Sequence, residues 1–403
     1  MTAGRPTVAL HISHTDVRVD ARILREMDAI RGMAGIQVEG IGVESSECRD
    51  AGGGSAQSEV KVVRLLSQKL RFLPRPLRYL LNFVELGARV LPSALRVRPA
   101  IVHCHDTLVL PVGVAIRAMT GCALIYDAHE LESEKNGQSA TLARITLWIE
   151  RCSWKWISLL VSVSPAIIDW YEMNLGPKRS TLVLNSPVLS RTSPSSRMHG
   201  TRSRVPAGYF HERFGIALGE PVFVYVGYIV PGRGIERVVD AFLRPGTSAH
   251  AVFMGSGDEA RVRALLSSAP NIHWHPPVPH DRVVELIRDA TCGLCLIEDV
   301  SLSDRYCLPN KLFEYAFAGV PVLASRLPEI ERMVEDYGLG MCCDNDAGSI
   351  ANAVKTIMER GLASPSGDLS EISWDRQAMR LRAAYADLLN CASGRASSRE
   401  TGD

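Results

Sequence analysis

The side chains best suited to hold a phosphate group lie in Leu308–Ser325, in the C-terminal half of the chain. Pro309 and Asn310 begin a predicted helix there. Lys311 and Glu314 then lie one turn apart near its N-terminus. A lysine at this place suits a diphosphate, and a carboxylate suits ribose hydroxyls. On spacing alone, a solvated ion pair between these two side chains is the simpler interpretation.

Two glycine-rich turns earlier in the same half follow predicted strands and precede predicted helices. Their candidate binding residues are Gly227, Arg233, Gly234, Gly255 and Gly257. Such a turn presents backbone N–H groups and the positive end of a helix to an anion, and an arginine grips phosphate with two donors. Plain turn chemistry explains each glycine pair equally well.

Histidines and carboxylates stand at the ends of two predicted strands in the N-terminal half. His105 ends the strand Ile101–His105. His129 and Glu130 follow the strand Ala123–Asp127. Because the carboxyl ends of neighbouring parallel strands share one edge of a sheet, these side chains predict a site there. A lone histidine is more often structural, but two at corresponding strand ends favour function.

Three further polar candidates follow the first predicted strand, namely His14, Asp16 and Arg22. They are expected to face the same site, although a capped helix with salt bridges explains Asp16 and Arg22 as well. Metal binding at the strand-end histidines is not expected, because no third ligand is spaced for it.

Short β-rich runs alternate with helical patterns along the chain, which predicts parallel βαβ units. The predicted strands are Thr7–Ser13, Gln37–Val43, Ile101–His105, Ala123–Asp127, Leu159–Ser164, Thr181–Leu184, Val222–Val226, Ala251–Met254, Ile272–Trp274, Gly293–Ile297 and Val320–Ala324. The fold class is therefore α/β, with two tandem Rossmann-like, doubly wound parallel-sheet domains and an active site in the cleft between them.

Composition sets the expected domain boundaries. Residues 1–190 form the first domain, and residues 191–215, rich in Ser, Arg and Pro, form a linker. Residues 216–372 form the second domain, 373–392 a helix that packs back on the first domain, and 393–403 a disordered tail. An oxidoreductase of the Rossmann class is disfavoured, because no G-x-G-x-x-G follows the first strand.

The bulk composition excludes several classes of protein. The 403 residues carry 45 basic and 44 acidic side chains, a balance that does not favour a nucleic-acid partner. The N-terminal apolar run is too short for a signal peptide, and no segment is long enough to span a membrane. A cytoplasmic protein with ten reduced cysteines is expected, and the Cys292/Cys295 pair is assigned to the core.

Basic residues interleaved with apolar ones crowd the segment Lys61–Arg98. This pattern suits an anionic membrane surface, and Trp148, Trp154, Lys155 and Trp156 offer a second such face. The protein is therefore expected to be peripheral on the inner face of the cell membrane. A helix that packs its apolar side on the sheet and solvates its arginines explains the segment equally.

The run Leu308–Ser325 resembles the second-domain motif of retaining GT-B glycosyltransferases of family 4, the glycosyl transferases group 1. The resemblance covers roughly residues 220–360 and reverses the preference for a plain ion pair. It implies that Arg233 and Lys311 hold the diphosphate of a nucleotide sugar and that Glu314 orients the ribose. No cofactor and no metal are expected, since basic side chains and helix N-termini stabilise the leaving diphosphate.

The N-terminal half resembles the same family less tightly. The resemblance implies that His105 contacts the donor sugar and that His129 and Glu130 line the acceptor side. Three further residues are assigned to the acceptor side, namely His14, Asp16 and Arg22.

Two positions depart from the family's pattern. Tyr306 stands where the family has the first of two glutamates, and Tyr228 stands where it has an arginine. Asp304, Asp299 or Glu298 is the candidate to replace that glutamate, and Asp304 is assigned a catalytic role.

The resemblance implies transfer of a hexose-type sugar from a nucleoside diphosphate sugar to an acceptor hydroxyl, with retention. The expected acceptor is a sugar, a lipid-linked group or a small molecule, in polysaccharide, glycolipid or glycosylated metabolite biosynthesis. A GT-B nucleotide-sugar epimerase and a non-catalytic GT-B partner protein remain open alternatives, and the two tyrosines favour the latter.

Overall fold

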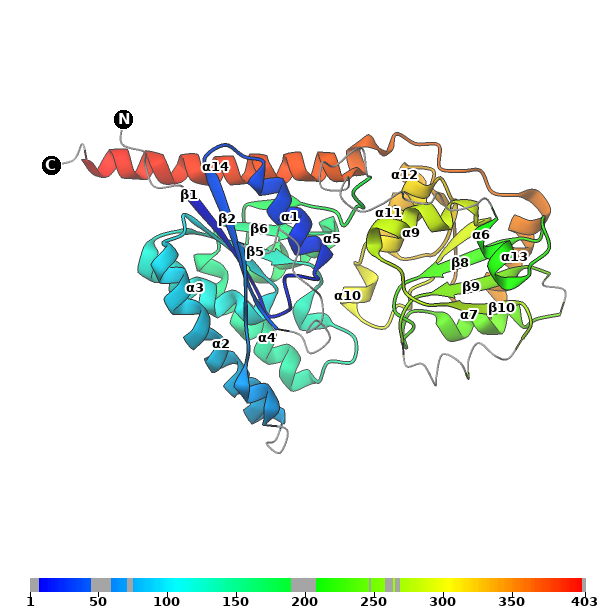
Figure 1. The fold of residues 1–403 in the computed structure, drawn as a ribbon, viewed down its shortest axis with the longest axis horizontal. Helices are drawn as coiled ribbons and strands as arrows, with labels where there is room; N and C mark the ends of the chain where they lie inside the picture. Colours follow the sequence, from blue (N-terminus) through cyan, green and yellow to red (C-terminus); the bar gives the residue numbers. More distant parts are fainter. Residues whose placement is uncertain are drawn as a thin grey trace. The chain divides into compact units, whose positions relative to one another are not determined.

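The computed structural model describes residues 7–44, 59–70, 75–189, 208–245, 248–257, 264 and 269–400 (Figure 1). The chain divides into two compact units. The first comprises Met1–Val183 and Gln377–Asp403, and the second comprises Leu184–Arg376. Most of the expected linker, up to residue 207, lies outside the described residues, and the chain is already part of the second unit at Leu184.

The first unit contains a parallel sheet of seven strands in the order β3-β2-β1-β4-β5-β6-β7. The strands are β1 Thr7–Ser13, β2 Ile36–Val43, β3 Val60–Val63, β4 Ile101–His105, β5 Ala123–Ala128, β6 Leu159–Ser162 and β7 Ser180–Leu182. The helices are α1 Ala21–Arg31, α2 Arg75–Val97, α3 Leu110–Thr120, α4 Ala140–Ser153, α5 Pro165–Leu175 and α14 Trp374–Glu400.

Helices cover both faces of this sheet, and strand β4 shows how the side chains divide between them. His103 contacts Tyr385 of α14, whereas the next residue, Cys104, packs against Gly113 of α3. Successive side chains of a strand point to opposite faces, so α14 and α3 lie in different layers. Helix α1 shares the layer of α14, because Arg382 donates to the carbonyl of Ala29 over 2.7 Å.

The second unit contains a parallel sheet of six strands in the order β10-β9-β8-β11-β12-β13. The strands are β8 Val222–Val226, β9 His250–Met254, β10 Ile272–His275, β11 Cys292–Cys295, β12 Val322–Ser325 and β13 Gly340–Cys343. The helices are α6 Tyr209–Phe214, α7 Ile235–Phe242, α9 His280–Leu286, α10 Leu302–Arg305, α11 Asn310–Ala318, α12 Pro328–Asp336 and α13 Ala347–Arg360.

Each sheet has one point where its strand order reverses. In the first unit this point lies between β1 and β4, and in the second between β8 and β11. Ligands of doubly wound sheets bind beyond the carboxyl ends of the strands at such points. The histidines of β4 and the glycine turn after β8 therefore lie where a site is expected.

All eleven predicted strands form, with ends shifted by at most two residues. Two strands are additional: β3 lies inside the basic segment, and β13 has the sequence Gly-Met-Cys-Cys, which lacks the β-branched residues that mark strands. The expected disordered tail from Ser393 is wrong, because α14 continues to Glu400. Its alanines and arginines are good helix formers.

Candidate active site

The side chain of Lys311 projects from the first turn of α11 toward the glycine turn after β8. Only 8% of the residue is exposed, and its ammonium finds no hydrogen-bond partner among the described residues. The Nζ atom lies 3.6 Å from the ring centroid of Tyr225 and 3.8 Å from where a Cβ of Gly227 would stand. No side chain caps the helix start, where Asn310 is exposed. A buried ammonium without a hydrogen-bond partner among the described residues, beside a helix start that no side chain caps, favours an anionic ligand.

The two glycine turns of the second unit pack directly against each other. A Cβ on Gly255 would lie 1.8 Å from the carbonyl oxygen of Gly227, so a larger residue cannot stand there. Gly257 forms a parallel bridge with Ile229 beside this contact. Gly234 has φ 71° and would bring a Cβ within 2.2 Å of the carbonyl oxygen of Leu296. These glycines let the loops after β8 and β9 approach closely.

The other donor-side candidates surround this turn. Glu314 is 7% exposed, and its Oε1 lies 4.0 Å from Nδ1 of the exposed His280. Arg233 lies 3.9 Å from the carboxylate of the buried Asp304. Tyr306, the departure from the family pattern, is only half-buried.

The structure separates the three carboxylates that are candidates for the missing glutamate. Asp299 pairs with Arg305 and Glu298 pairs with Arg237. Only Asp304 contacts the side chain of Arg233, the arginine of the glycine turn.

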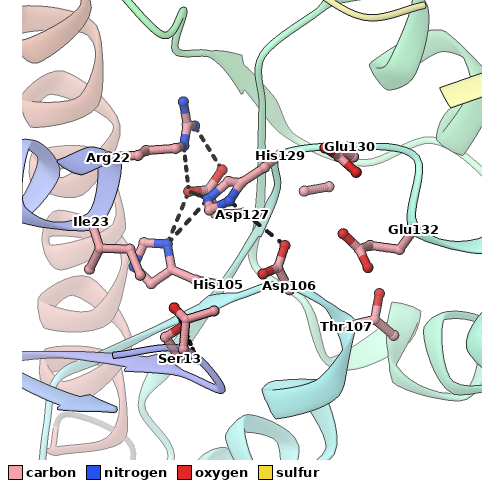
Figure 2. Close-up of polar contacts among 12 residues, drawn as sticks. Ser13, Arg22, Ile23, His105, Asp106, Thr107, Asp127, His129, Glu130 and Glu132 are labelled. Carbon is pink, nitrogen blue, oxygen red and sulfur yellow. Dashed lines mark hydrogen bonds and ion pairs between the residues drawn. The ribbon is translucent and has the colours of Figure 1, made fainter. Parts of the chain in front are cut away.

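In the first unit, the buried carboxylate of Asp127 connects three of the predicted residues (Figure 2). Arg22 donates to both of its oxygens, over 2.8 and 3.2 Å. His129 Nε2 and His105 Nδ1 lie 2.7 and 3.1 Å from Oδ2. The carboxylate therefore holds a guanidinium and two imidazoles in fixed positions at the strand ends.

These contacts set the charges of the group. Burial opposes ionisation of Asp127, but Arg22 and His129 more than offset it and hold its pKa well below the usual range. Burial lowers the pKa of His129, yet the Asp127 carboxylate outweighs that effect and raises it to about 9. His129 is therefore an imidazolium at neutral pH, and 18% of its side chain is exposed.

Asp106, directly after β4, adopts a backbone conformation that is nearly restricted to glycine. Its φ is 70° and its ψ is 164°. Its side chain lies 3.7 Å from His129 (Figure 2). It also lies 3.6 Å from His14. Such strain costs about 1–3 kcal/mol and concentrates at functional sites, so Asp106 joins the candidate residues.

The remaining predicted residues lie at different depths. His105 is fully buried, and its Nε2 contacts Nδ1 of His11 over 3.0 Å. Asp16 pairs with Arg18 over 2.6 Å. Glu130 is exposed and pairs with Lys135, away from Asp127 (Figure 2).

Four buried polar residues behind this group were not predicted as site residues, namely His11, Glu26, His103 and Tyr385. The Tyr385 hydroxyl lies 2.8 Å from His103 Nδ1 and 3.3 Å from His11 Nε2. Burial lowers the pKa of both histidines well below the usual value, so they are neutral. His103 and His105 lie two residues apart on one strand, which indicates that their side chains share one face of the sheet. No local pattern in the sequence indicates that Tyr385 contacts them.

Two sets of described side chains have ligand atoms close enough together to hold a metal ion. One is His105, Asp127 and His129; the other is His11, Glu26, His103 and His105. The expectation that no third ligand accompanies the strand-end histidines is therefore wrong. The register of β1 and β4 pairs His11 with His103, and α1 supplies Glu26.

The basic segment Lys61–Arg98 contains β3 and α2, and part of its charge is paired. Arg64 pairs with Glu44, and Arg89 pairs with Glu85. On α4, the apolar side chains Leu142, Ile145 and Trp148 are exposed, the last by 65%. Among the described residues, no helix has the length and apolar character needed to cross a bilayer.

Two family models match this chain. Residues 220–360 match the model described as glycosyl transferases group 1, and residues 21–187 match the glycosyl transferase 4-like domain. The chain is also 28% identical, over 199 residues, to a D-inositol 3-phosphate glycosyltransferase of Acidothermus cellulolyticus. That match spans 44% of this chain and 43% of the relative, less than half of its length.

Solved structures with the same fold cover nearly the whole chain. Sucrose-phosphate synthase from Thermosynechococcus elongatus superposes with a TM-score of 0.69 at 16% identity, over 98% of this chain and 100% of that one. The HepE protein of Anabaena in complex with UDP gives a TM-score of 0.66 at 13% identity, over 96% of this chain and 100% of that one. Identities this low are evidence for the fold alone.

Proposed function

Because the chain belongs to the glycosyl transferases of group 1 and has their GT-B architecture, we propose that it transfers a hexose-type sugar from a nucleoside diphosphate sugar to an acceptor hydroxyl. One observation carries this proposal. The ammonium of Lys311 is buried without a hydrogen-bond partner among the described residues, beside Gly227 and at the N-terminus of α11. A diphosphate supplies the negative charge that this arrangement lacks.

The donor is held by residues of the second unit. Lys311 and Arg233 bind the diphosphate and stabilise the charge that develops on it as the glycosidic bond breaks. Glu314, one turn further along α11, accepts hydrogen bonds from the ribose. The UDP bound to the Anabaena relative supports a uridine diphosphate sugar as the donor class. These basic groups need no metal for this step.

The roles toward the sugar and the acceptor are assigned to residues at the strand ends of the first unit. His129 is the cation of that group with a partly exposed side chain, so we assign it the contact with the transferred sugar. His105, which is fully buried, acts through the shared carboxylate of Asp127 as a positioning residue. Asp304 takes the task of the glutamate that Tyr306 replaces, because it contacts Arg233. Transfer with retention is part of the proposal.

The exposed stripe on α4 supports a lipid-linked acceptor. Leu142, Ile145 and Trp148 follow helical spacing, with Arg144 and Arg151 on the same helix. An apolar stripe with adjacent arginines suits an anionic membrane surface. We therefore include peripheral membrane binding, with a role in glycolipid or polysaccharide biosynthesis.

A panel of UDP-, GDP- and ADP-sugars, with and without acceptors, tests the proposal by release of the nucleotide. The expected result is release that requires an acceptor and a single preferred nucleotide. Formation of an epimer without any acceptor would instead identify an epimerase. Failure of every nucleoside diphosphate to bind in calorimetry would identify a non-catalytic partner protein.

A further inference from the structure

Four ionisable side chains converge beneath His129, on the sheet face that α1 and α14 cover. They are His11, Glu26, His103 and His105. None has any exposed surface. One ligand atom of each lies within 4.8 Å of a ligand atom of every other. Three imidazoles and a carboxylate are a ligand set that zinc and similar divalent metals bind.

The outer atoms of these side chains are held by other groups. His105 Nδ1 lies 3.1 Å from the carboxylate of Asp127, as in the carboxylate–histidine–metal arrangement of metalloproteins. His11 Nε2 and His103 Nδ1 both contact the Tyr385 hydroxyl. These contacts leave the opposite ring nitrogens directed at the cluster itself, as in metal sites where one nitrogen of each histidine binds the metal and the other is hydrogen-bonded to a neighbouring group.

The carboxylate is oriented in the same way. Glu26 Oε1 forms an ion pair with the guanidinium of Arg22 over 3.1 Å, without a hydrogen bond among the described residues, and Oε2 is the atom nearer to His103. In the three histidines, the ring nitrogen that an outer group holds by a hydrogen bond is therefore different from the nitrogen that faces the cluster.

Among the described residues, two of the four inner atoms have no hydrogen-bond partner, and the other two lie within hydrogen-bond distance of each other. His103 Nε2 and Glu26 Oε2 have no hydrogen-bond partner among the described residues, although both are fully buried. They lie 3.7 Å apart, and Asp127 Oδ2 lies 3.8 Å from the same nitrogen. His11 Nδ1 and His105 Nε2 lie 3.0 Å apart. Two ligand atoms of a tetrahedral zinc, each about 2.0–2.1 Å from it, are separated by about 3.4 Å. This separation lies between the 3.0 Å of the His11–His105 pair and the 3.7 Å of the His103–Glu26 pair.

We infer that His11, Glu26, His103 and His105 form a structural site for a divalent metal of the zinc type, which ties α1 to strands β1 and β4. The ligands would be Nδ1 of His11, Nε2 of His103, Nε2 of His105 and Oε2 of Glu26. A four-ligand set with no exposed surface has no open position for substrate, so the role is structural. The site is separate from the diphosphate site of Lys311, and its existence does not depend on the proposed transfer.

The test begins with the unaltered protein. The full chain, without an affinity tag made of histidines, is produced in zinc-supplemented medium and dialysed against a chelator. Elemental mass spectrometry is expected to find about one zinc per chain. X-ray absorption at the zinc edge is expected to show only nitrogen and oxygen ligands at about 2.0–2.1 Å. A chain with less than about one tenth of an equivalent of metal, or a sulfur shell at about 2.3 Å from its cysteines, would overturn the inference.

Two ligand variants and one matched variant complete the test. Glu26→Gln and His103→Gln are expected to lower the zinc retained after dialysis at least tenfold. His211→Gln, in the second unit, is expected to retain the wild-type amount. Equal retention in all three variants would contradict the assignment. If the ligand variants do not fold, as judged by circular dichroism, the measurement on the unaltered protein still decides the question.

Discussion

Replacement of Lys311 by methionine should separate binding from stability. The ammonium is buried and unpaired, so its hydrogen bond to a bound diphosphate is of the charged type, about 1.5–3 kcal/mol. Lys311→Met is therefore expected to weaken binding of the preferred nucleoside diphosphate by about 10- to 150-fold. Calorimetric titration of both proteins measures this change.

The same substitution should leave the unliganded protein nearly as stable as the wild type. It removes the contact of the ammonium with the Tyr225 ring, which contributes up to about 2 kcal/mol, and also the cost of burying an unpaired charge, about 1–3 kcal/mol. The free energy of unfolding in urea is expected to change by less than about 1 kcal/mol. Unchanged nucleotide affinity, or a loss of stability above about 2 kcal/mol, would show that Lys311 is a structural residue. Lys355→Met, at an exposed position of α13, is the matched control and should change neither quantity.

Other substitutions test separate parts of the argument. Gly255→Ala places a Cβ 1.8 Å from a backbone oxygen of the facing turn and should cost several kcal/mol of stability and abolish nucleotide binding, whereas Gly87→Ala, with 3.7 Å to its nearest neighbour, should be neutral or slightly stabilising in urea unfolding. Burial raises the pKa of Glu150 even though Tyr126, Tyr171 and Thr107 donate hydrogen bonds to it. Its contribution to stability is then fully present below its unfolded pKa of about 4.3 and is lost as pH rises through the folded pKa, so Glu150→Gln should flatten the pH dependence of unfolding above pH 4.3; an unaltered slope would argue against a raised pKa. Trp148→Glu should reduce sedimentation with anionic vesicles without changing turnover of a water-soluble acceptor, and equal sedimentation of both proteins would remove α4 from the membrane proposal.

Most strands of the two sheets could be predicted from the sequence, because apolar β-rich runs alternate clearly with segments of helical periodicity. The two unpredicted strands are exceptions with a physical cause. β3 is four residues long and lies in a segment that is read as amphipathic and basic, and β13 consists of Gly, Met and Cys. Sheet pairing, not intrinsic preference, makes β13 extended, whereas β3, with three valines in four residues, was missed because it is short and lies in the basic segment.

The part of the candidate site that could be predicted from the sequence is the part where polar and ionisable residues follow the ends of neighbouring strands. His105, His129 and Arg22 meet at Asp127, as the shared edge of parallel strands requires. The partner of Asp16 was not predictable, because Arg18 and Arg22 are both within reach of it along the chain. The strained backbone of Asp106 has no sequence signal either, since aspartate occurs in many ordinary turns.

The return of the chain to its first unit at Gln377 affects how the protein is made. Tyr385, which contacts His11 and His103, is synthesised about 200 residues after Val183. At about 5–20 residues per second, a ribosome needs about 10–40 s for that interval. Throughout this time the sheet face that α1 and α14 share in the finished protein lacks α14. The ribosome thus synthesises all of the second unit before it adds the last helix of the first unit. The second unit is therefore complete before the first, although the first begins earlier in the sequence.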